Sequence, residues 1–209
     1  FGNRLMINDS KIVRGKGVVL NLDNLDTDQL VPARFMSVSR SEGYSDFLFY
    51  DLRRLENGQF DESFPINIVK GASFLIAGKN FGMGSSREAA VYALCDFGFR
   101  VLVAPSFSDI FAANAVNNGL IPVKINQTHL KSISLEAQKN DTQCILDLEA
   151  LLLKVGSVEI TFDLDPIWKE KLLKGWDDID MGLSHVQDIL LFSKMLRSEK
   201  PWVFPLEAK

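Results

Sequence analysis

The strongest constraint on the fold is an alternation of apolar, strand-like segments with helix-compatible segments through the middle of the chain. The expected strands are residues 73–77, 100–104 and 121–125, and the expected helices are residues 86–97 and 108–117. Gly98 and Gly119 follow the two helices, where glycine commonly caps a helix C-terminus. This order predicts an α/β fold with a parallel or mixed sheet flanked by helices, and ligand-binding loops at the carboxyl ends of the strands.

The flanking parts of the chain add further elements. Strand-like segments occur at residues 15–22, 144–148 and 158–162. Asp165 followed by Pro166 predicts a helix that runs to Lys174, because aspartate caps helix N-termini and proline is tolerated at the first helical position. Residues 37–63 are instead rich in turn formers and aromatic residues without periodicity, which indicates an inserted or mobile loop region.

The C-terminal region carries a second helix signal and an apolar tail. Ser184 and Gln187 match a capping box, which predicts a helix through about Leu196. The tail over residues 201–206 contains a tryptophan and a phenylalanine. Because aromatic side chains anchor protein interfaces, we expect residues 201–209 to dock on a partner rather than fold back on their own domain.

The composition bounds the classes of protein that this chain can be. Its 209 residues and 46% hydrophobic content fit one domain over residues 1–209 with a sizeable core. The formal net charge of -4 argues against a general binder of nucleic acid or anionic membranes, so an anionic ligand must be met by local groups. We expect no membrane span, no leader segment and a cytoplasmic location. We expect residues 1–5 to be non-native and Met6 to be the native start.

Cysteine and histidine are too few for a metal centre in this chain. Cys95 and Cys144 lie far apart in apolar sequence, so we expect two reduced, buried and inert thiols. An iron–sulfur cluster needs more thiolates than these, and His129 and His185 match no zinc-ligand spacing. We expect a structural role for His185. Any cluster must therefore belong to another chain.

Residues 78–88 place glycines, two adjacent serines and an arginine between an expected strand and an expected helix. The first turn of a helix leaves backbone N–H groups unpaired and carries partial positive charge, which favours a carboxylate or phosphate near Ser85 and Ser86. Arg87 adds a planar fork suited to a carboxylate, although a simple helix cap with a surface salt bridge is the alternative for this motif alone. The Walker A lysine is absent, and Arg87 occupies the third glycine position of the dinucleotide fingerprint. The loop predicts an anion site that is not built for a nucleotide.

Four motifs, in order along the chain, favour the anion site over the simple helix cap. They lie at residues 26–35, 78–88, 105–111 with 117–122, and 175–185. Together they closely resemble the small-subunit family of 3-isopropylmalate dehydratases, which are swivel-domain partners in the aconitase superfamily. The resemblance runs from about Gly17 to about Leu196 and implies a compact β/β/α swivel domain.

This resemblance implies a hydro-lyase that interconverts 2-isopropylmalate and 3-isopropylmalate by loss and readdition of water in leucine biosynthesis. It also implies a larger partner chain that holds a [4Fe-4S] cluster, without which this chain is inactive. Ser86 matches the serine whose alkoxide removes the proton beside a substrate carboxylate, and Ser85, Gly84 and Arg87 match its carboxylate-binding neighbours. Such a site must stabilise an aci-carboxylate dianion, for which clustered N–H groups and an arginine are suited.

Two further positions gain candidate roles from the resemblance. Arg53 falls where the family's substrate-recognition loop, within residues 37–63 here, carries an arginine that contacts the substrate side group. A solvated surface charge is the alternative for Arg53. Asp28 is a candidate for supporting a partner's catalytic histidine, whereas we expect Asp26 to form a local turn.

The loop departs from the usual family pattern at four positions. Met83, Ala89, Val91 and Tyr92 stand where the family has Cys, His, Pro and Trp, while the Ser-Ser-Arg core is unchanged. These departures leave two alternatives open. One is a related hydro-lyase for another branched or methylated di- or tricarboxylic acid, such as methylcitrate or a dimethylmalate-like compound. The other is a non-catalytic binding or regulatory module.

Overall fold

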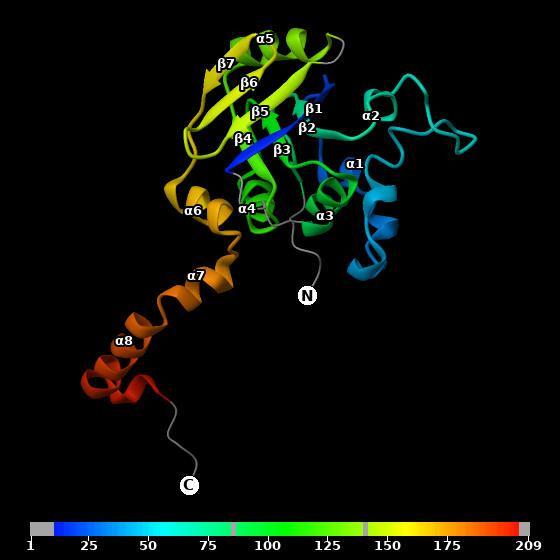
Figure 1. Ribbon diagram of the computed structural model, residues 1–209. Coiled ribbons are helices and arrows are strands. Elements are labelled where there is room, and N and C mark those ends of the chain that lie inside the picture. The colour runs from blue at the N-terminus through cyan, green and yellow to red at the C-terminus, as the bar shows by residue number, and fades with distance from the viewer. Residues whose placement is uncertain (1–10, 85–86, 140–141, 205–209) are drawn as a thin grey trace.

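A mixed β-sheet forms the centre of the molecule (Figure 1). The computed structural model describes residues 11–84, 87–139 and 142–204. Within these residues seven strands lie in the order β4-β3-β2-β1-β5-β6-β7. The strands are β1 (Ile12–Leu20), β2 (Ala72–Ala77), β3 (Val101–Ala104), β4 (Ile121–Lys124), β5 (Gln143–Asp147), β6 (Leu152–Val155) and β7 (Val158–Thr161). Neighbours from β1 to β4 pair in parallel, and the pairs from β1 through β5 and β6 to β7 are antiparallel.

Helices follow the parallel strands and continue to the C-terminus. The α-helices of the described residues are α1 (Thr27–Leu30), α2 (Pro65–Ile68), α3 (Glu88–Phe97), α4 (Asp109–Asn117), α5 (Gln127–Ala137), α6 (Pro166–Lys174), α7 (Asp178–Ser184) and α8 (Val186–Glu199). Short 3₁₀ turns include η1 (Ala33–Phe35), η2 (Arg40–Glu42), η3 (Ser45–Phe47) and η4 (Pro201–Val203). The connections β2-α3-β3 and β3-α4-β4 are the alternation that the sequence predicts, so the predicted α/β fold is confirmed.

Two hydrophobic clusters cover the two faces of the sheet. Successive residues of a strand point to opposite faces, so Leu75 lies in one cluster and Phe74 and Ile76 lie in the other. Helix α3 and the segment from Tyr44 to Phe49 belong to the first cluster, whereas α5 and α6 contribute to the second. The two layers of helices bury the β2 strand and fix the loop that follows it.

Several local predictions are confirmed. Gly98 caps α3 in the left-handed conformation with a φ of 117°. Asp165 caps α6, and its carboxylate accepts hydrogen bonds from the N–H groups of Ile167 and Trp168. Cys95 and Cys144 are both buried and free. The expected helix over residues 86–97 is described from Glu88, with Arg87 at the N-cap position.

The predicted capping box at Ser184 and Gln187 is wrong. Ser184 is the last residue of α7, and its hydroxyl donates to the Met181 carbonyl at 2.7 Å. The next helix, α8, begins at Val186 without a side-chain cap. A box of the same type lies one helix earlier, where Asp177 caps α7. His185 therefore lies between two helices, with its Nδ1 3.6 Å from an Asp188 oxygen.

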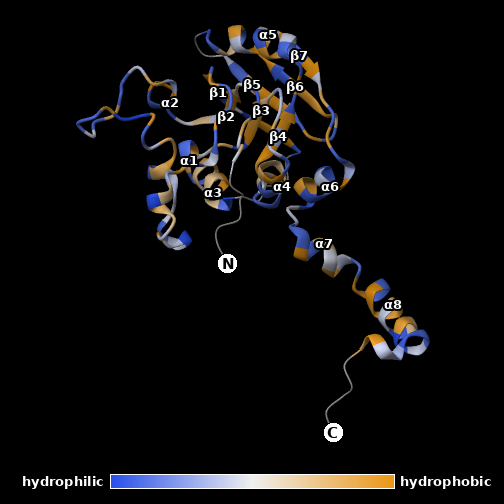
Figure 2. Ribbon diagram, turned by 180° about the vertical axis from the view of Figure 1, so that it is seen from behind, coloured by the Kyte–Doolittle hydropathy of each residue, from blue (hydrophilic) through white to orange (hydrophobic). Residues whose placement is uncertain are grey.

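The C-terminal helices leave the body of the molecule. Figures 1 and 2 show α7 and α8 extending from α6 away from the sheet. Neither helix has a buried residue. Across the ranges that the structure describes, no helix is both long enough and apolar enough to cross a membrane.

Candidate active site

The loop that follows β2 is held by a segment about 55 residues earlier in the chain. The Lys79 N–H donates to an Asp23 carboxylate oxygen at 2.9 Å, and the Asn24 N–H donates to the Lys79 carbonyl at 2.8 Å. The Gly78 N–H donates to the Leu22 carbonyl at 3.1 Å. The β1 and β2 ends therefore present their loops together, as expected at the carboxyl edge of parallel strands.

A third segment, after β3, completes the same edge. The Ser106 hydroxyl accepts a hydrogen bond from the Asn80 N–H at 2.8 Å and lies 3.0 Å from the Asn80 side-chain oxygen. The Asn80 side-chain amide donates to the Asn24 side-chain oxygen at 2.8 Å. Asn24 and Asn80 both have positive φ, which asparagine tolerates better than most residues. Sequence reasoning did not single out this polar chain, and the two asparagines in turn sequences are the signal that could have found it.

Aromatic packing supports the loop from below. Phe81 is fully buried against Phe107 and Phe111. Gly82 has a φ of 72°, and a β-carbon at that position would lie 2.2 Å from the Phe111 ring. Only glycine fits there, because both the conformation and the close approach of the ring exclude a side chain.

The end of the loop pairs with the start of α1. The N–H groups of Gly82 and Met83 both donate to the Leu25 carbonyl, and the Thr27 N–H donates to the Met83 carbonyl at 3.0 Å. Gly84 follows with a φ of 93°. Asp26 caps α1 through a capping box with Gln29, so the predicted local turn at Asp26 is confirmed. Three of the motifs singled out in the sequence thus meet at one place.

Arg87 and Asp28 form an ion pair across this edge. The Arg87 Nη1 donates to the Asp28 carboxylate. The Arg87 side chain is 24% exposed and that of Asp28 is 54% exposed, so the pair remains open to a ligand from solvent. Arg87 is also the N-cap of α3, and its carbonyl accepts from the Ala90 N–H at 3.2 Å, so the N–H groups of Glu88 and Ala89 precede the first bond of the helix. Ser85 and Ser86 lie outside the described residues, between Gly84 and Arg87.

The 37–63 region packs against α3. Arg40 makes a bidentate contact with Asp96 at 2.6 and 2.7 Å, and the Tyr44 N–H donates to the same carboxylate. The Arg40 guanidinium also lies 4.5 Å from the centre of the Tyr92 ring. Burial, with the nearby Glu88 carboxylate, raises the pKa of Tyr92 to about 12. The region that lacks periodicity in sequence thus includes the short turns η2 and η3, and its side-chain contacts with α3 hold it in position.

Arg53 is buried and not a solvated surface charge. Its Nη2 donates to the carbonyls of Ser45 and Asp46, at 3.4 and 3.1 Å. Its guanidinium carbon lies 5.0 Å from the Phe60 ring and 5.3 Å from the Phe97 ring. Burial lowers the pKa of Arg53, and the Arg54 charge acts in the same direction. The Nε atom has no hydrogen-bond partner among the described residues.

The cysteines do not contribute to this edge. Cys95 lies in the cluster around α3, whereas Cys144 lies in the cluster on the other face of the sheet. Burial raises the pKa of Cys95 to about 12 and that of Cys144 to about 11. No group of three or more His, Cys, Asp or Glu side chains within the described ranges is placed to hold a metal ion. These residues do not fit an iron–sulfur cluster.

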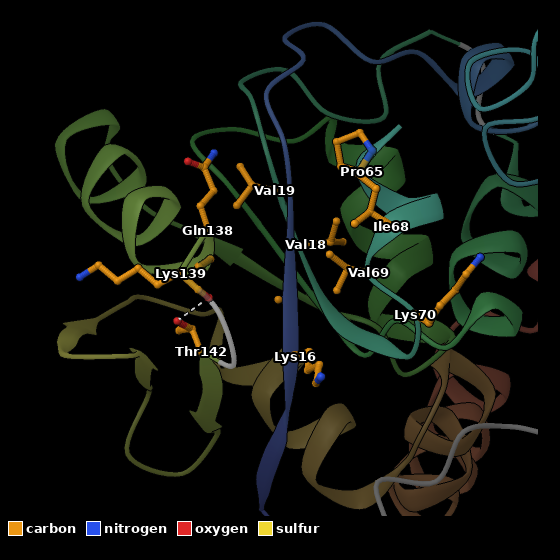
Figure 3. A pocket seen from close by; sticks show the side chains of 12 residues that line it. Lys16, Val18, Val19, Pro65, Ile68, Val69, Lys70, Gln138, Lys139 and Thr142 are labelled. Atoms are coloured by element: carbon orange, nitrogen blue, oxygen red, sulfur yellow. Dashed lines mark hydrogen bonds between the residues drawn. The ribbon is translucent and has the colours of Figure 1, made fainter. Parts of the chain in front are cut away.

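A separate hollow of about 770 Å³ lies beside β1, between α2 and the end of α5 (Figure 3). Val18, Val19, Ile68 and Val69 line it together with lysine side chains at its rim. None of the predicted site residues that the structure describes is among its lining residues.

Comparison with known proteins identifies the family. The aconitase C-terminal domain matches residues 9–128. The 3-isopropylmalate dehydratase small subunit of Bacillus velezensis is 43% identical over 181 residues, which cover 85% of this chain and 91% of that subunit. The chain belongs to the family of 3-isopropylmalate dehydratase small subunits. The family member from Caulobacter vibrioides is 42% identical over 192 residues, covering 90% of this chain and 95% of that subunit.

A solved structure agrees with this membership. The crystal structure of 3-isopropylmalate dehydratase from Methanocaldococcus jannaschii superposes with a TM-score of 0.62 and is 25% identical, covering 88% of this chain and 98% of that one. The predicted family and the predicted swivel-type α/β fold are confirmed. The predicted class, a hydro-lyase subunit of leucine biosynthesis, is also confirmed at the level of the family.

The departures from the usual dehydratase small-subunit pattern fall into two groups. Ala89 and Val91 are buried in α3, and Tyr92 packs its ring edge against Tyr44. Met83 is 42% exposed in the loop next to Gly84. Three of the departures therefore belong to the packing of α3, whereas Met83 presents its side chain to solvent beside the candidate site.

Proposed function

We propose that this chain supplies the base and the carboxylate anchors of a 3-isopropylmalate dehydratase, which interconverts 2-isopropylmalate and 3-isopropylmalate. The observation that carries this proposal is the convergence of the three loops after β1, β2 and β3 around Gly84 and Arg87. Membership of the small-subunit family supports it independently.

In this proposal Ser86 removes the proton from the carbon beside a substrate carboxylate. A serine hydroxyl is a weak base, so its alkoxide needs a positive surrounding field that lowers its pKa. In this proposal Arg87 and the N-terminus of α3 would supply such a field. The same groups, with Ser85 and the Gly84 backbone, would stabilise the aci-carboxylate dianion formed when the proton leaves.

The reaction is balanced by the loss of water and its return. The proton leaves one carbon and hydroxide leaves the neighbouring carbon, which gives an unsaturated acid and water. Water then adds back with its hydrogen and hydroxyl on the opposite carbons. Asp28 acts as a positioning residue in this proposal, because its ion pair holds the Arg87 guanidinium toward the loop until a substrate carboxylate takes its place.

Arg53 is the proposed contact to the substrate side-group region. Its Nη2 donates to loop carbonyls, whereas its Nε has no hydrogen-bond partner among the described residues. In this proposal the guanidinium therefore keeps N–H donors for a substrate oxygen or for water. A buried arginine held in this way shapes the 45–53 segment as well as presenting a charge.

The proposed partner is a larger subunit that carries the [4Fe-4S] cluster, in the cytoplasm. The relatives are named small subunits, which implies a large one. The two cysteines of this chain are buried on opposite sides of the sheet and do not fit the cluster. We therefore expect no dehydratase activity from this chain alone.

The test is an anaerobic activity assay of the chain reconstituted with the cluster-bearing subunit of the same genome. The substrates are 2-isopropylmalate, citrate, methylcitrate and dimethylmalate, because the exposed Met83 makes a different side group the main competing outcome. We expect turnover of 2-isopropylmalate, and a loss of roughly 10²–10⁴-fold in kcat for Ser86→Ala.

Ser132→Ala on α5 is the matched control, since its hydroxyl bonds only within its own helix. An unchanged turnover number for Ser86→Ala would contradict the base assignment. Turnover of another acid alone would point to a related hydro-lyase. A complex that forms but turns over none of the acids would make the chain a binding or regulatory module.

A further inference from the structure

The helices α7 and α8 and the turn η4 form an arm that exposes apolar side chains along its length. Ten large apolar residues of residues 178–204 are between 41% and 76% exposed. Five of them follow closely in α8: Ile189, Leu190, Leu191, Phe192 and Met195. Figure 2 shows hydrophobic segments of α8 alternating with hydrophilic ones, well away from the sheet. Isolated apolar residues on a surface are ordinary, but a continuous run is typical of an interaction site.

The apolar residues surround α8 rather than forming one stripe. With 100° between successive residues, Ile189 and Phe192 share one side of the helix. Leu191 and Met195 lie about 110° away in one direction, and Val186 and Leu190 lie about 110° away in the other. Polar residues such as Asp188 and Lys194 lie between them, so α8 offers apolar side chains on several sides without being apolar throughout.

The base of the arm is fixed to the body. Asn117, the last residue of α4, donates from its side-chain amide to Asp178 at 2.8 Å, and its side-chain oxygen accepts from Lys171 at 3.0 Å. Lys171 is buried in α6 and also pairs with Asp178. This three-residue clamp holds the start of α7 to the body.

The exposed area is that of an interface. Ten large apolar side chains, each about 150 Å² or more when fully open and somewhat more than half exposed here, present roughly 900 Å². The largest apolar patch of an ordinary monomer is about 300–600 Å². One side of a standard stable interface buries about 800 Å².

We infer that the arm is a docking element for the large subunit, seated in an apolar groove of that partner. This inference rests on the proposed partner. A second copy of the chain could cover α8 by pairing helix to helix, but that contact buries one stripe about 100° wide. Such a stripe can hold Leu191 and Phe192 but leaves Leu190, on another side of the helix, in water. A groove about 20 Å long, the length of the 14-residue α8, covers several sides at once.

The test measures binding of the full-length chain to the large subunit by calorimetry. The double variant Leu191→Ser, Phe192→Ser should raise the Kd at least tenfold. Turnover at saturating small subunit should remain unchanged, as should the thermal midpoint of the isolated chain, because both side chains are exposed in it. The control Gln187→Ala, Ser198→Ala changes polar positions of the same helix and should leave the Kd within twofold.

Each outcome decides the matter. A Kd that stays within twofold for the Leu191, Phe192 double variant overturns the inference. So does a dimer of the isolated chain that this variant dissociates while the Kd for the large subunit is unchanged, since the arm would then serve a second copy. If the variant lowers the thermal midpoint, Trp202→Ser on η4 replaces it with the same tenfold criterion. Ser86→Ala should bind normally, which separates failure of docking from failure of the proposed chemistry.

Discussion

The loop edge, where the loops after β1, β2 and β3 meet, and the C-terminal arm differ in the contacts that hold them. At the loop edge, the hydrogen bonds join residues far apart in sequence, such as Lys79 with Asp23 and Asn80 with Ser106. Phe81 beneath them is fully buried. In the arm, the Asp177 capping box joins residues three positions apart, and neither helix buries a residue.

This difference suits the loop edge to a preorganised site and the arm to binding another molecule. A site that stabilises developing charge must have its donors in place before the substrate arrives, and long-range contacts provide that rigidity. An element with few buried contacts adds little to the body's stability and retains its apolar surface for another molecule. We therefore expect substitutions at the loop edge to act on folding and chemistry, and substitutions in the arm to act on assembly.

The largest contrast comes from two glycine substitutions. Gly82→Ala places a β-carbon 2.2 Å from the Phe111 ring at a φ of 72°, so we expect a loss of roughly 2–4 kcal/mol in the free energy of unfolding. Gly182→Ala lies within α7 with nothing within 4 Å of the added carbon, so we expect a gain of roughly 0.5–1 kcal/mol in helix stability. Urea unfolding and far-ultraviolet circular dichroism measure the two effects.

Gly98→Ala is the control for backbone strain in the absence of a steric clash. Its φ is 117°, and its added carbon also meets nothing within 4 Å. It should cost less than Gly82→Ala, because only backbone strain remains. Equal losses for Gly82→Ala and Gly98→Ala would mean that the Phe111 ring moves freely and that the loop is not held from below.

A second, smaller contrast lies within the recognition loop. Arg53→Met removes the Nη2 donor shared by the carbonyls of Ser45 and Asp46, which keep only longer bonds, from the Leu48 N–H at 3.4 Å and from the Arg54 Nη1 at 3.5 Å. We therefore expect a loss of roughly 1–3 kcal/mol in the free energy of unfolding. In the reconstituted enzyme we also expect a raised KM. Arg54→Met is the matched control, because the Arg54 Nη1 contacts the Asp46 carbonyl only at 3.5 Å and the residue is half-buried.

The Arg53 and Arg54 variants can be told apart by two readouts. Unfolding in urea gives the structural loss, and steady-state kinetics gives the KM. A destabilised Arg53→Met protein with an unchanged KM would reduce Arg53 to a structural role. A raised KM for Arg54→Met alone would move the substrate contact to the neighbouring arginine.

The sequence alone predicts the elements whose apolar patterns and caps are strong. The strands β2, β3 and β4 and the helices α3, α4 and α6 fall where expected, since each is bounded by glycine, proline or aspartate signals. Helix α5 was not predicted, because only Leu130 and Ile133 are buried along it. Strand β6 has four residues and α7 has no buried residue, so neither leaves a clear period.

The motifs predict which residues belong to the site, but not how these residues contact one another. Resemblance pointed to Gly84, Arg87, Arg53 and Asp28, and the structure shows that Asp28 contacts Arg87. That pairing joins residues 59 positions apart, which no local pattern reveals. The burial of Arg53 could not be predicted from the sequence either, because its hydrogen-bond partners are backbone carbonyls. The role of Ser86 stays a prediction.

The smallest expected effect is at the base of the arm. Its Lys171 and Asn117 partners lower the pKa of Asp178 below its usual 3.8. A carboxylate with a lowered folded-state pKa stabilises the fold above its unfolded value, and this contribution disappears as the pH falls through the folded value. Because Asp178 is 72% exposed, we expect Asp178→Asn to cost less than about 1 kcal/mol at pH 7. Urea unfolding of both proteins should give a difference at pH 7 that shrinks as the pH falls below about 4. A difference that is constant with pH would mean that geometry alone, and not the carboxylate charge, holds α7 to the body.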